Sequence, residues 1–299
     1  MRVAFSGSGG LLAVAMFLCG LLSPAPSRSA ELRAVAVIPP LQFLLDRVAG
    51  AAVTSSSLVD GGRDPHSFEP TMRQIADLAG ADLYVSGNLE FERGFRDKLV
   101  ATSPRLTVVA PPAAIPRLAA ADHDAEEGED AHHHQDADTH LWMSPANAKL
   151  LAAAIAGALA DRDPGNADTY RGNLARLHAE LDGVDARIRG ELAPHRGKTF
   201  YVYHPAFAYF ARDYGLVQKA VEAGGRAPSP KQLARLIERA RGDRVRIIFV
   251  QPQFDRVSAE TLAGSLGAAV VPLDVMAYDL LANFRLIAER LRQAFETKP

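Results

Sequence analysis

Short apolar runs alternate with amphipathic stretches along most of the chain. The first run, residues 32–38, is followed by two prolines and a helical pattern over residues 41–49. Strands that alternate with helices form βα units, so the pattern predicts α/β regions with mainly parallel sheets. The expected strands are 32–38, 53–59, 83–86, 105–109, 199–203, 245–251 and 269–273, and the expected helices are 41–49, 72–79, 206–214, 230–241, 258–266 and 280–295.

A long amphipathic helix is predicted in the middle of the chain, from Pro164 to Pro194. Its apolar residues recur every three or four positions and form one continuous stripe. They are Tyr170, Leu174, Leu177, Leu181, Val184, Ile188 and Leu192. At 1.5 Å per residue such a helix extends roughly 40 Å, enough to lie along two lobes. We therefore expect an N-terminal lobe (31–163), a connecting spine helix (164–194) and a C-terminal lobe (195–299).

Residues 1–30 have the pattern of a secretory signal peptide. Arg2 precedes a short apolar run, and small residues follow it up to Ala30. The run is too short for a membrane-spanning helix, which needs about 20 residues. The bulky Leu18 before Cys19 does not favour a lipid anchor. We predict cleavage near Ser29 or Ala30 and a periplasmic mature protein.

Composition narrows the possible functions. The chain is 48% hydrophobic and 23% charged, with a formal net charge of −2. This is typical of a globular protein and does not favour nucleic-acid binding. The one cysteine, Cys19, lies in the predicted signal peptide. A metal site in the mature chain must therefore use His, Asp or Glu.

Residues 121–138 form an acidic, histidine-rich segment. It contains eight of the 35 acidic residues and no basic one. Such a segment has little apolar surface to bury, so we expect a disordered loop. Its histidines could make weak auxiliary contacts with a metal, or the segment could be a solvated insertion. These histidines are His123, His132, His133 and His134.

Four other residues follow predicted strands or lie at turns: His66, His140, His204 and Asp274. Ligands of open α/β sheets bind beyond the carboxyl ends of the strands. Three imidazoles and a carboxylate would suit a four-coordinate Zn²⁺ site. Taken singly, each histidine could instead be a hydrogen-bonded packing residue, and Asp274 could cap a turn.

Taken together, the motifs resemble those of the solute-binding proteins of zinc and manganese ABC transporters, specifically the zinc-type (ZnuA-like) members. The resemblance extends over about residues 32–295. It rests on Asp-Pro-His-Ser-Phe-Glu-Pro at 64–70, Thr-His-Leu-Trp-Met-Ser-Pro at 139–145, the stretch 204–216 and Leu-Asp at 273–274.

The resemblance implies two α/β lobes, each with a mainly parallel sheet, and a metal cleft between them. It makes His66, His140, His204 and Asp274 the metal ligands. A histidine at position 204 is similar to the zinc class, because manganese members tend to have glutamate there. The resemblance also implies a monomer that delivers Zn²⁺ to a membrane permease, with ATP hydrolysed by a separate subunit.

Three residues depart from the family pattern. Thr139 and Pro205 stand where proline and aspartate are common, and Gln251 replaces a frequent glutamate. Other functions stay open: a manganese- or iron-binding member, an extracellular adhesin or metal buffer on this scaffold, or a zinc-dependent hydrolase with Asp274 or Glu69 as base. The sequence contains neither an H-E-x-x-H nor a G-x-S-x-G motif, which argues against a hydrolase.

Overall fold

The computed structural model describes residues 32–119, 137–222, 229–243, 245–254 and 256–297, together with Ala4. Residues 31–299 form one compact unit. The predicted signal peptide, apart from Ala4, and residues 121–136 of the predicted loop lie outside the described residues. No helix of the described parts is long and apolar enough to cross a membrane.

The N-terminal lobe is built on a four-stranded sheet in the order β2-β1-β3-β4, with every neighbouring pair parallel. Its elements are β1 (Leu32–Ala36), α1 (Pro39–Ala49), β2 (Val53–Ser57), α2 (Met72–Ala79), β3 (Leu83–Val85), α3 (Arg96–Thr102), β4 (Thr107–Val109) and α4 (Pro145–Arg162).

The C-terminal lobe repeats this plan with the strand order β6-β5-β7-β8, again all parallel. Its elements are β5 (Thr199–Val202), α6 (Ala208–Tyr214), β6 (Val217–Ala220), α7 (Pro230–Gly242), β7 (Ile247–Val250), α8 (Arg256–Leu266), β8 (Ala269–Pro272) and α9 (Leu280–Glu296). The prediction of two mainly parallel sheets flanked by helices is confirmed.

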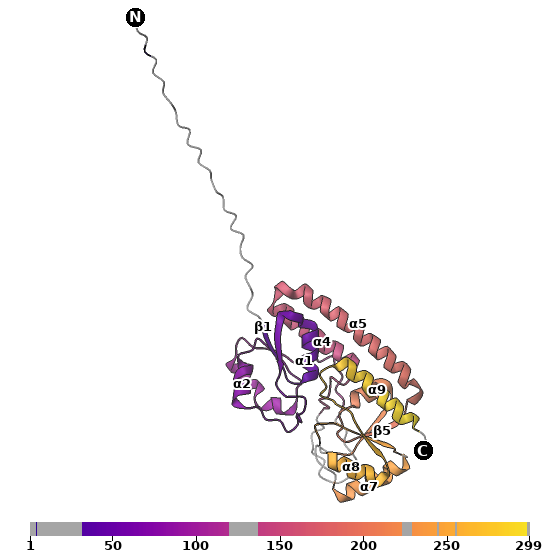
Figure 1. The fold of residues 1–299 in the computed structure, drawn as a ribbon. Coiled ribbons are helices and arrows are strands. Elements are labelled where there is room, and N and C mark those ends of the chain that lie inside the picture. Colours follow the sequence, from indigo (N-terminus) through magenta and orange to yellow (C-terminus); the bar gives the residue numbers. More distant parts are fainter. Residues whose placement is uncertain are drawn as a thin grey trace. The chain divides into compact units, whose positions relative to one another are not determined.

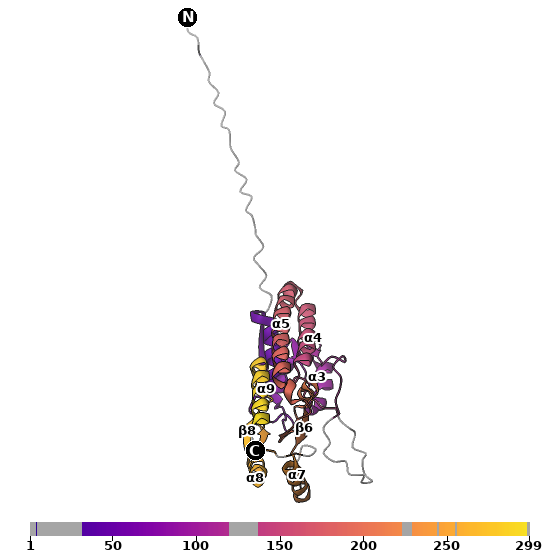
Figure 2. The same cartoon turned by 90° about the vertical axis from the view of Figure 1, so that its right-hand side faces the viewer.

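Helix α5 (Ala167–Leu192) is the predicted spine helix, with a short 3₁₀ turn at each end. It packs on α1 and α4 of the first lobe and on α9 and α6 of the second, and it lies beside α4 and α9 in both views (Figures 1 and 2). Six of the seven residues of the apolar stripe are buried, while Leu174 is half-buried. The stripe therefore fastens both lobes to one rigid helix.

The sequence pattern missed α4, although that helix carries much of the core. Its buried face alternates alanines with larger residues, including Ala148, Ala152 and Ile155. Because alanine also occupies its other faces, the helix is apolar all round and shows no amphipathic period. The edge strand β6 and the short helix α3 were also missed, since neither has a continuous apolar pattern.

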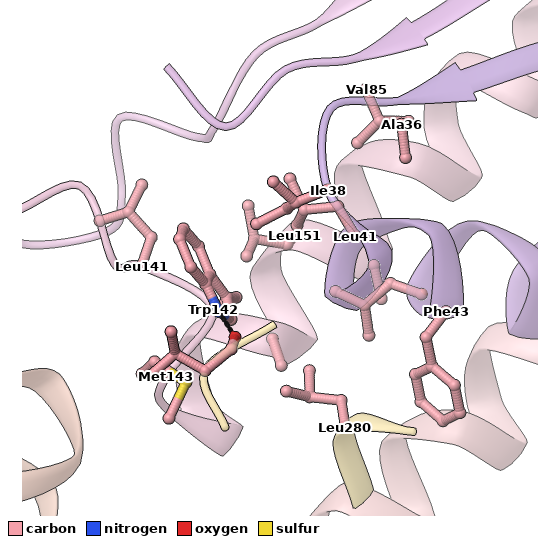
Figure 3. Packing of buried hydrophobic residues seen from close by; sticks show 14 of the residues in the cluster. Ala36, Ile38, Leu41, Phe43, Val85, Leu141, Trp142, Met143, Leu151 and Leu280 are labelled. Carbon is pink, nitrogen blue, oxygen red and sulfur yellow. Dashed lines mark hydrogen bonds between the residues drawn. The ribbon is translucent and has the colours of Figure 1, made fainter. Parts of the chain in front are cut away.

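The core extends from one lobe into the other beneath the motif at 139–145. Figure 3 shows Trp142 beside Ile38, Leu41 and Leu151. The indole Nε1–H of Trp142 donates to the backbone oxygen of Val275, at 2.8 Å. Trp142 thus packs in the N-terminal lobe and bonds to the segment that follows β8.

Candidate metal centre

Three histidine side chains from distant parts of the chain converge at one point between the lobes. The Nε2 atom of His140 lies 3.4 Å from Nε2 of His66 and 3.2 Å from Nε2 of His204. All three ring nitrogens lie within 4.8 Å of one another. His204 comes just after β5. The next two strands along the chain, β6 and β7, lie on opposite sides of β5 in the sheet, so the strand order switches direction there. This is where an open α/β sheet binds its ligands.

The distances from Nε2 of His140 to the other two nitrogens match those of a tetrahedral metal site. With zinc–nitrogen bonds of about 2.05 Å, the edges of a tetrahedron measure about 3.3 Å. The two closest separations here are 3.2 and 3.4 Å. Two of the three separations therefore have the length of an edge of a zinc-sized tetrahedron, and the third is below 4.8 Å.

The position of His140 is fixed by Asp138. Oδ1 of Asp138 accepts a hydrogen bond from the backbone N–H of His140 and lies 2.8 Å from its Nδ1. A proton on Nδ1 leaves Nε2 with a free lone pair for a metal. The next residues secure this segment, because Ser144 caps α4 by accepting from the backbone N–H of Asn147 and Pro145 occupies the first turn.

Asp138 also corrects the predicted extent of the loop. We expected residues 121–138 to be disordered, but Asp138 is buried and its backbone N–H donates to the oxygen of Leu118. Ala119 and Ala137 form an antiparallel bridge beside it. Tyr209 donates to the backbone oxygen of Asp138. The segment that begins at Ala137 therefore belongs to the packed lobe and to the site.

His204 has an equivalent carboxylate partner, Glu222. Oε2 of Glu222 lies 3.0 Å from Nδ1 of His204, and both side chains are buried. Gln251 holds the backbone of His204 from both sides, accepting from its N–H at 3.1 Å and donating to its oxygen at 2.9 Å. Phe254 stacks on the imidazole at 4.5 Å between ring centroids. His204 is thus held in orientation and tautomer.

His66 lies on an exposed loop between β2 and α2. Asp64 accepts from the backbone N–H of His66 at 2.9 Å and from the hydroxyl of Ser67 at 2.7 Å. The ring of His66 faces the other two imidazoles, with centroids 5.4 Å from His140 and 4.7 Å from His204. Although the residue is exposed, its ring contacts the rings of the other two histidines.

The site disfavours protons. Burial, followed by the neighbouring His140 and His204, lowers the pKa of His66 from 6.5 to about 3, against a smaller opposing effect of Asp64. Burial also lowers the pKa of His204, although the hydrogen bond to Glu222 partly offsets this. Converging neutral imidazoles present lone pairs that a divalent cation can satisfy.

The fourth predicted ligand, Asp274, does not join this group. Its Oδ1 accepts from Nε2 of Gln253 and from the backbone N–H of Met276, both at 2.8 Å. The predicted auxiliary contacts of the loop, His123, His132, His133 and His134, lie outside the described residues. The structure therefore brings together three of the four ligands that the resemblance implied.

Sequence reasoning missed Asp138, Glu222 and Gln253 around the site. Asp138 could have been found, because Asp64-Pro65-His66 and Asp138-Thr139-His140 share the spacing Asp-x-His, and in both the aspartate accepts the backbone N–H of the histidine. Glu222 gave no such signal, since only the pairing of β5 with β6 brings it to His204.

The fold and the site together define a two-lobe metal-binding protein, with the three clustered histidines contributed by both lobes. A family model described as "ZnuA: Zinc-uptake complex component A periplasmic" matches residues 34–294. The chain belongs to this family, whose members are components of zinc-uptake complexes.

Individual relatives agree with this assignment. The high-affinity zinc uptake system protein ZnuA of Yersinia pestis is 32% identical over 68% of this chain and 69% of its own length. The zinc-binding lipoprotein AdcA of Streptococcus pneumoniae is 29% identical over 84% of this chain, which spans about half (52%) of AdcA. The solved structure of a zinc-bound deletion mutant of ZnuA is 35% identical, with a TM-score of 0.82, over 90% of this chain and 100% of that one.

Proposed function

We propose that this protein binds Zn²⁺ outside the cytoplasm and delivers it to a membrane permease for uptake. The observation that carries the proposal is the convergence of ring nitrogens of His66, His140 and His204 within 4.8 Å of one another, with Nε2 of His140 at 3.4 and 3.2 Å from the other two. Zinc is the cargo, and the site binds and releases it without a chemical step.

The set of donor atoms favours Zn²⁺ over Mg²⁺, Ca²⁺ and Mn²⁺. Three neutral imidazoles disfavour Mg²⁺ and Ca²⁺, which prefer oxygen ligands. Manganese binds nitrogen ligands more weakly than zinc does in the Irving–Williams order. The third histidine, His204, is fixed by Glu222 and Gln251, so the nitrogen donor is built into the C-terminal lobe.

Binding on this proposal competes with protons. Zinc requires all three Nε2 lone pairs, and the carboxylates of Asp138 and Glu222 keep the protons of two rings on Nδ1. Ligands from both lobes join one ion, so zinc should couple the lobes. At 1,000 times its dissociation constant zinc would add about 4 kcal/mol to the free energy of unfolding.

The proposal includes the cellular setting. Residues 1–30 act as a cleaved signal peptide, and the mature chain works as a periplasmic monomer. Its partners are an ABC permease and a separate ATPase subunit. The histidines of residues 121–136 contribute weak zinc contacts that are separate from the site between the lobes.

Calorimetric titration of metal-free protein with Zn²⁺ tests the proposal, with Mn²⁺ as competitor. We expect one tight zinc site that Mn²⁺ does not displace, and loss of that site in His140→Ala. His178→Ala is a matched control, because His178 lies on α5 and bonds the backbone oxygen of Lys149. Preferential binding of Mn²⁺, or retention of the tight site in His140→Ala, would refute it. Ester or peptide turnover that stops on chelation would favour a hydrolase instead.

A further inference from the structure

Helix α6 of the C-terminal lobe holds the start of the segment that carries His140. Tyr209 is buried on this helix, and its hydroxyl donates to the backbone oxygen of Asp138 at 3.0 Å. The same hydroxyl accepts from the backbone N–H of Leu118 at 3.3 Å. Burial is the main cause of the raised pKa of Tyr209, so the hydroxyl keeps the proton that it donates. One side chain of the C-terminal lobe therefore bonds two parts of the N-terminal lobe just before His140.

The same helix also holds the end of this segment. Oδ2 of Asp213 accepts a hydrogen bond from the hydroxyl of Ser144 at 2.5 Å, and Ser144 is the residue that caps α4. Asp213 is itself held in place, because the guanidinium of Arg212 donates to its Oδ1 at 2.8 and 2.6 Å. Residues four positions apart on a helix lie on the same face, so Tyr209 and Asp213 face residues 138–144 together. The segment is thus bonded to α6 at both of its ends.

The carboxylate of Asp138 depends on this attachment. Its Oδ1 accepts from the backbone N–H of His140 and lies 2.8 Å from Nδ1 of the ring. Its Oδ2 is buried and has no hydrogen-bond partner among the described residues. No second side chain of the described parts therefore orients this carboxylate. Its position is set through the backbone of Asp138, whose N–H donates to the oxygen of Leu118 and whose oxygen accepts from Tyr209.

Helix α6 is also connected directly to His204, which lies in the short link between β5 and α6. The Nε2 atoms of His204 and His140 are 3.2 Å apart. We propose that Tyr209 and Asp213 are positioning residues of the metal site, which hold His140 and His204 as a preformed pair at the spacing that zinc requires. This inference rests on the proposed zinc-binding function. It makes α6 the element that fixes a histidine of one lobe relative to a histidine of the other.

Two substitutions test the two points of attachment. Tyr209→Phe removes the hydroxyl and keeps the ring, so it should weaken zinc binding by the equivalent of one hydrogen bond, about 2- to 10-fold. Asp213→Ala removes the acceptor of Ser144 and should have an effect of similar size. Tyr214→Phe is the matched control, because Tyr214 is a buried tyrosine of the same helix whose hydroxyl donates instead to Asp185 of α5, at 2.9 Å. It should leave the zinc affinity unchanged.

A double-mutant cycle separates positioning from a general loss of stability. Zinc dissociation constants are measured by competition with a chelator, and the melting temperature of each metal-free variant reports its folding. If Tyr209 acts on zinc through Asp138, the loss of affinity in Tyr209→Phe should nearly disappear in a protein that already carries Asp138→Ala. A purely structural role would give the same loss in both backgrounds, and that result would overturn the inference.

Asp213→Ala covers the case in which Tyr209→Phe does not fold, because it acts at the other end of the segment. Zinc affinity that is unchanged in both variants would overturn the inference, as would a loss in Tyr214→Phe equal to that in Tyr209→Phe. If the unmodified protein binds no zinc tightly, the proposed function itself fails. That is a different result from tight binding that does not depend on Tyr209 and Asp213.

Discussion

Oε2 of Glu222 lies 3.0 Å from Nδ1 of His204, and neither side chain has appreciable contact with solvent. The same relationship joins Asp138 to His140 at 2.8 Å. In each pair a buried carboxylate lies on the side of the ring opposite the nitrogen that faces the site. Two of the three proposed ligands are therefore held with Nε2 toward the site by carboxylates that would not contact the metal themselves.

The Glu222 contact should be measurable as zinc affinity. Glu222→Leu removes the acceptor at a buried position and should weaken zinc binding about 10- to 100-fold. Glu222→Gln keeps an acceptor oxygen for Nδ1–H, so we expect a smaller loss. Competition with a chelator at neutral pH measures both. Equal affinity in Glu222→Leu and the unmodified protein would show that His204 needs no orienting partner.

The end of the histidine-rich segment provides a second prediction. A deletion of residues 121–136 keeps Asp138, whereas a deletion of 121–138 removes it. Because Asp138 bonds both the backbone and the ring of His140, we expect only the longer deletion to weaken the tight site, by at least about tenfold. Zinc titration of both proteins tests this.

Asp138→Ala in the full chain is the control for that experiment. It should reproduce the loss seen in the longer deletion without changing the number of loop histidines. If the shorter deletion also abolished tight binding, the histidines at 123 and 132–134 would be the main zinc ligands, contrary to the proposed function.

Local patterns predicted most of the fold, because burial in this chain is mostly periodic. The stripe of α5 and the apolar strands β1 and β7 follow directly from the spacing of large side chains. Helix α4 was not predicted because it packs through alanines, so hydrophobic and polar positions do not alternate with a helical period. Likewise, a motif identified His66, His140 and His204, since each lies in a distinctive local sequence.

The partners of the ligands were harder to predict because they depend on tertiary contacts. Glu222 reaches His204 through the pairing of β5 with β6, and Gln253 reaches Gly61 across the cleft. Neither contact corresponds to a recognisable spacing of residues along the sequence. The resemblance predicted Asp274 as a metal ligand, whereas in the structure its Oδ1 accepts hydrogen bonds from Gln253 and Met276.

The lowered pKa values predict how the stability of the metal-free protein depends on pH. His66 and His204 take up protons less readily when folded than in the unfolded chain, where the pKa is 6.5. The unfolded state therefore binds more protons below that pH. We expect the free energy of unfolding to be unaffected by these groups above pH 6.5 and to fall as the pH drops toward about 3.

Urea unfolding at pH 7.5 and pH 5 measures this effect. His66→Asn should reduce the loss of stability between the two pH values, because it removes one of the two histidines whose pKa is lowered in the folded protein. His178→Asn, on α5 and away from the site, serves as the comparison. Zinc affinity should fall over the same pH range, since protons and zinc compete for the same lone pairs. A pH dependence identical in His66→Asn and the unmodified protein would contradict the assigned pKa.

Trp142 should report zinc binding directly, because it is the one tryptophan of the chain. Its ring lies 5.3 Å from that of His140, and its Nε1–H bonds the backbone oxygen of Val275 at 2.8 Å. Ordering His140 around a metal should change the emission of the indole. Fluorescence titration should therefore saturate at the same zinc ratio as calorimetry, and His140→Ala should abolish the change at that ratio.

Trp142→Phe tests whether Trp142 only reports zinc binding or also contributes to zinc affinity. It removes the signal and leaves the Val275 oxygen without its donor, which should lower the free energy of unfolding by about 1–3 kcal/mol. The imidazoles keep their carboxylate partners in this variant, so calorimetric zinc affinity should change far less than in Glu222→Leu. A loss of affinity in Trp142→Phe equal to that in Glu222→Leu would mean that the indole bond to Val275, which joins the two lobes, positions the ligands as strongly as the carboxylates do.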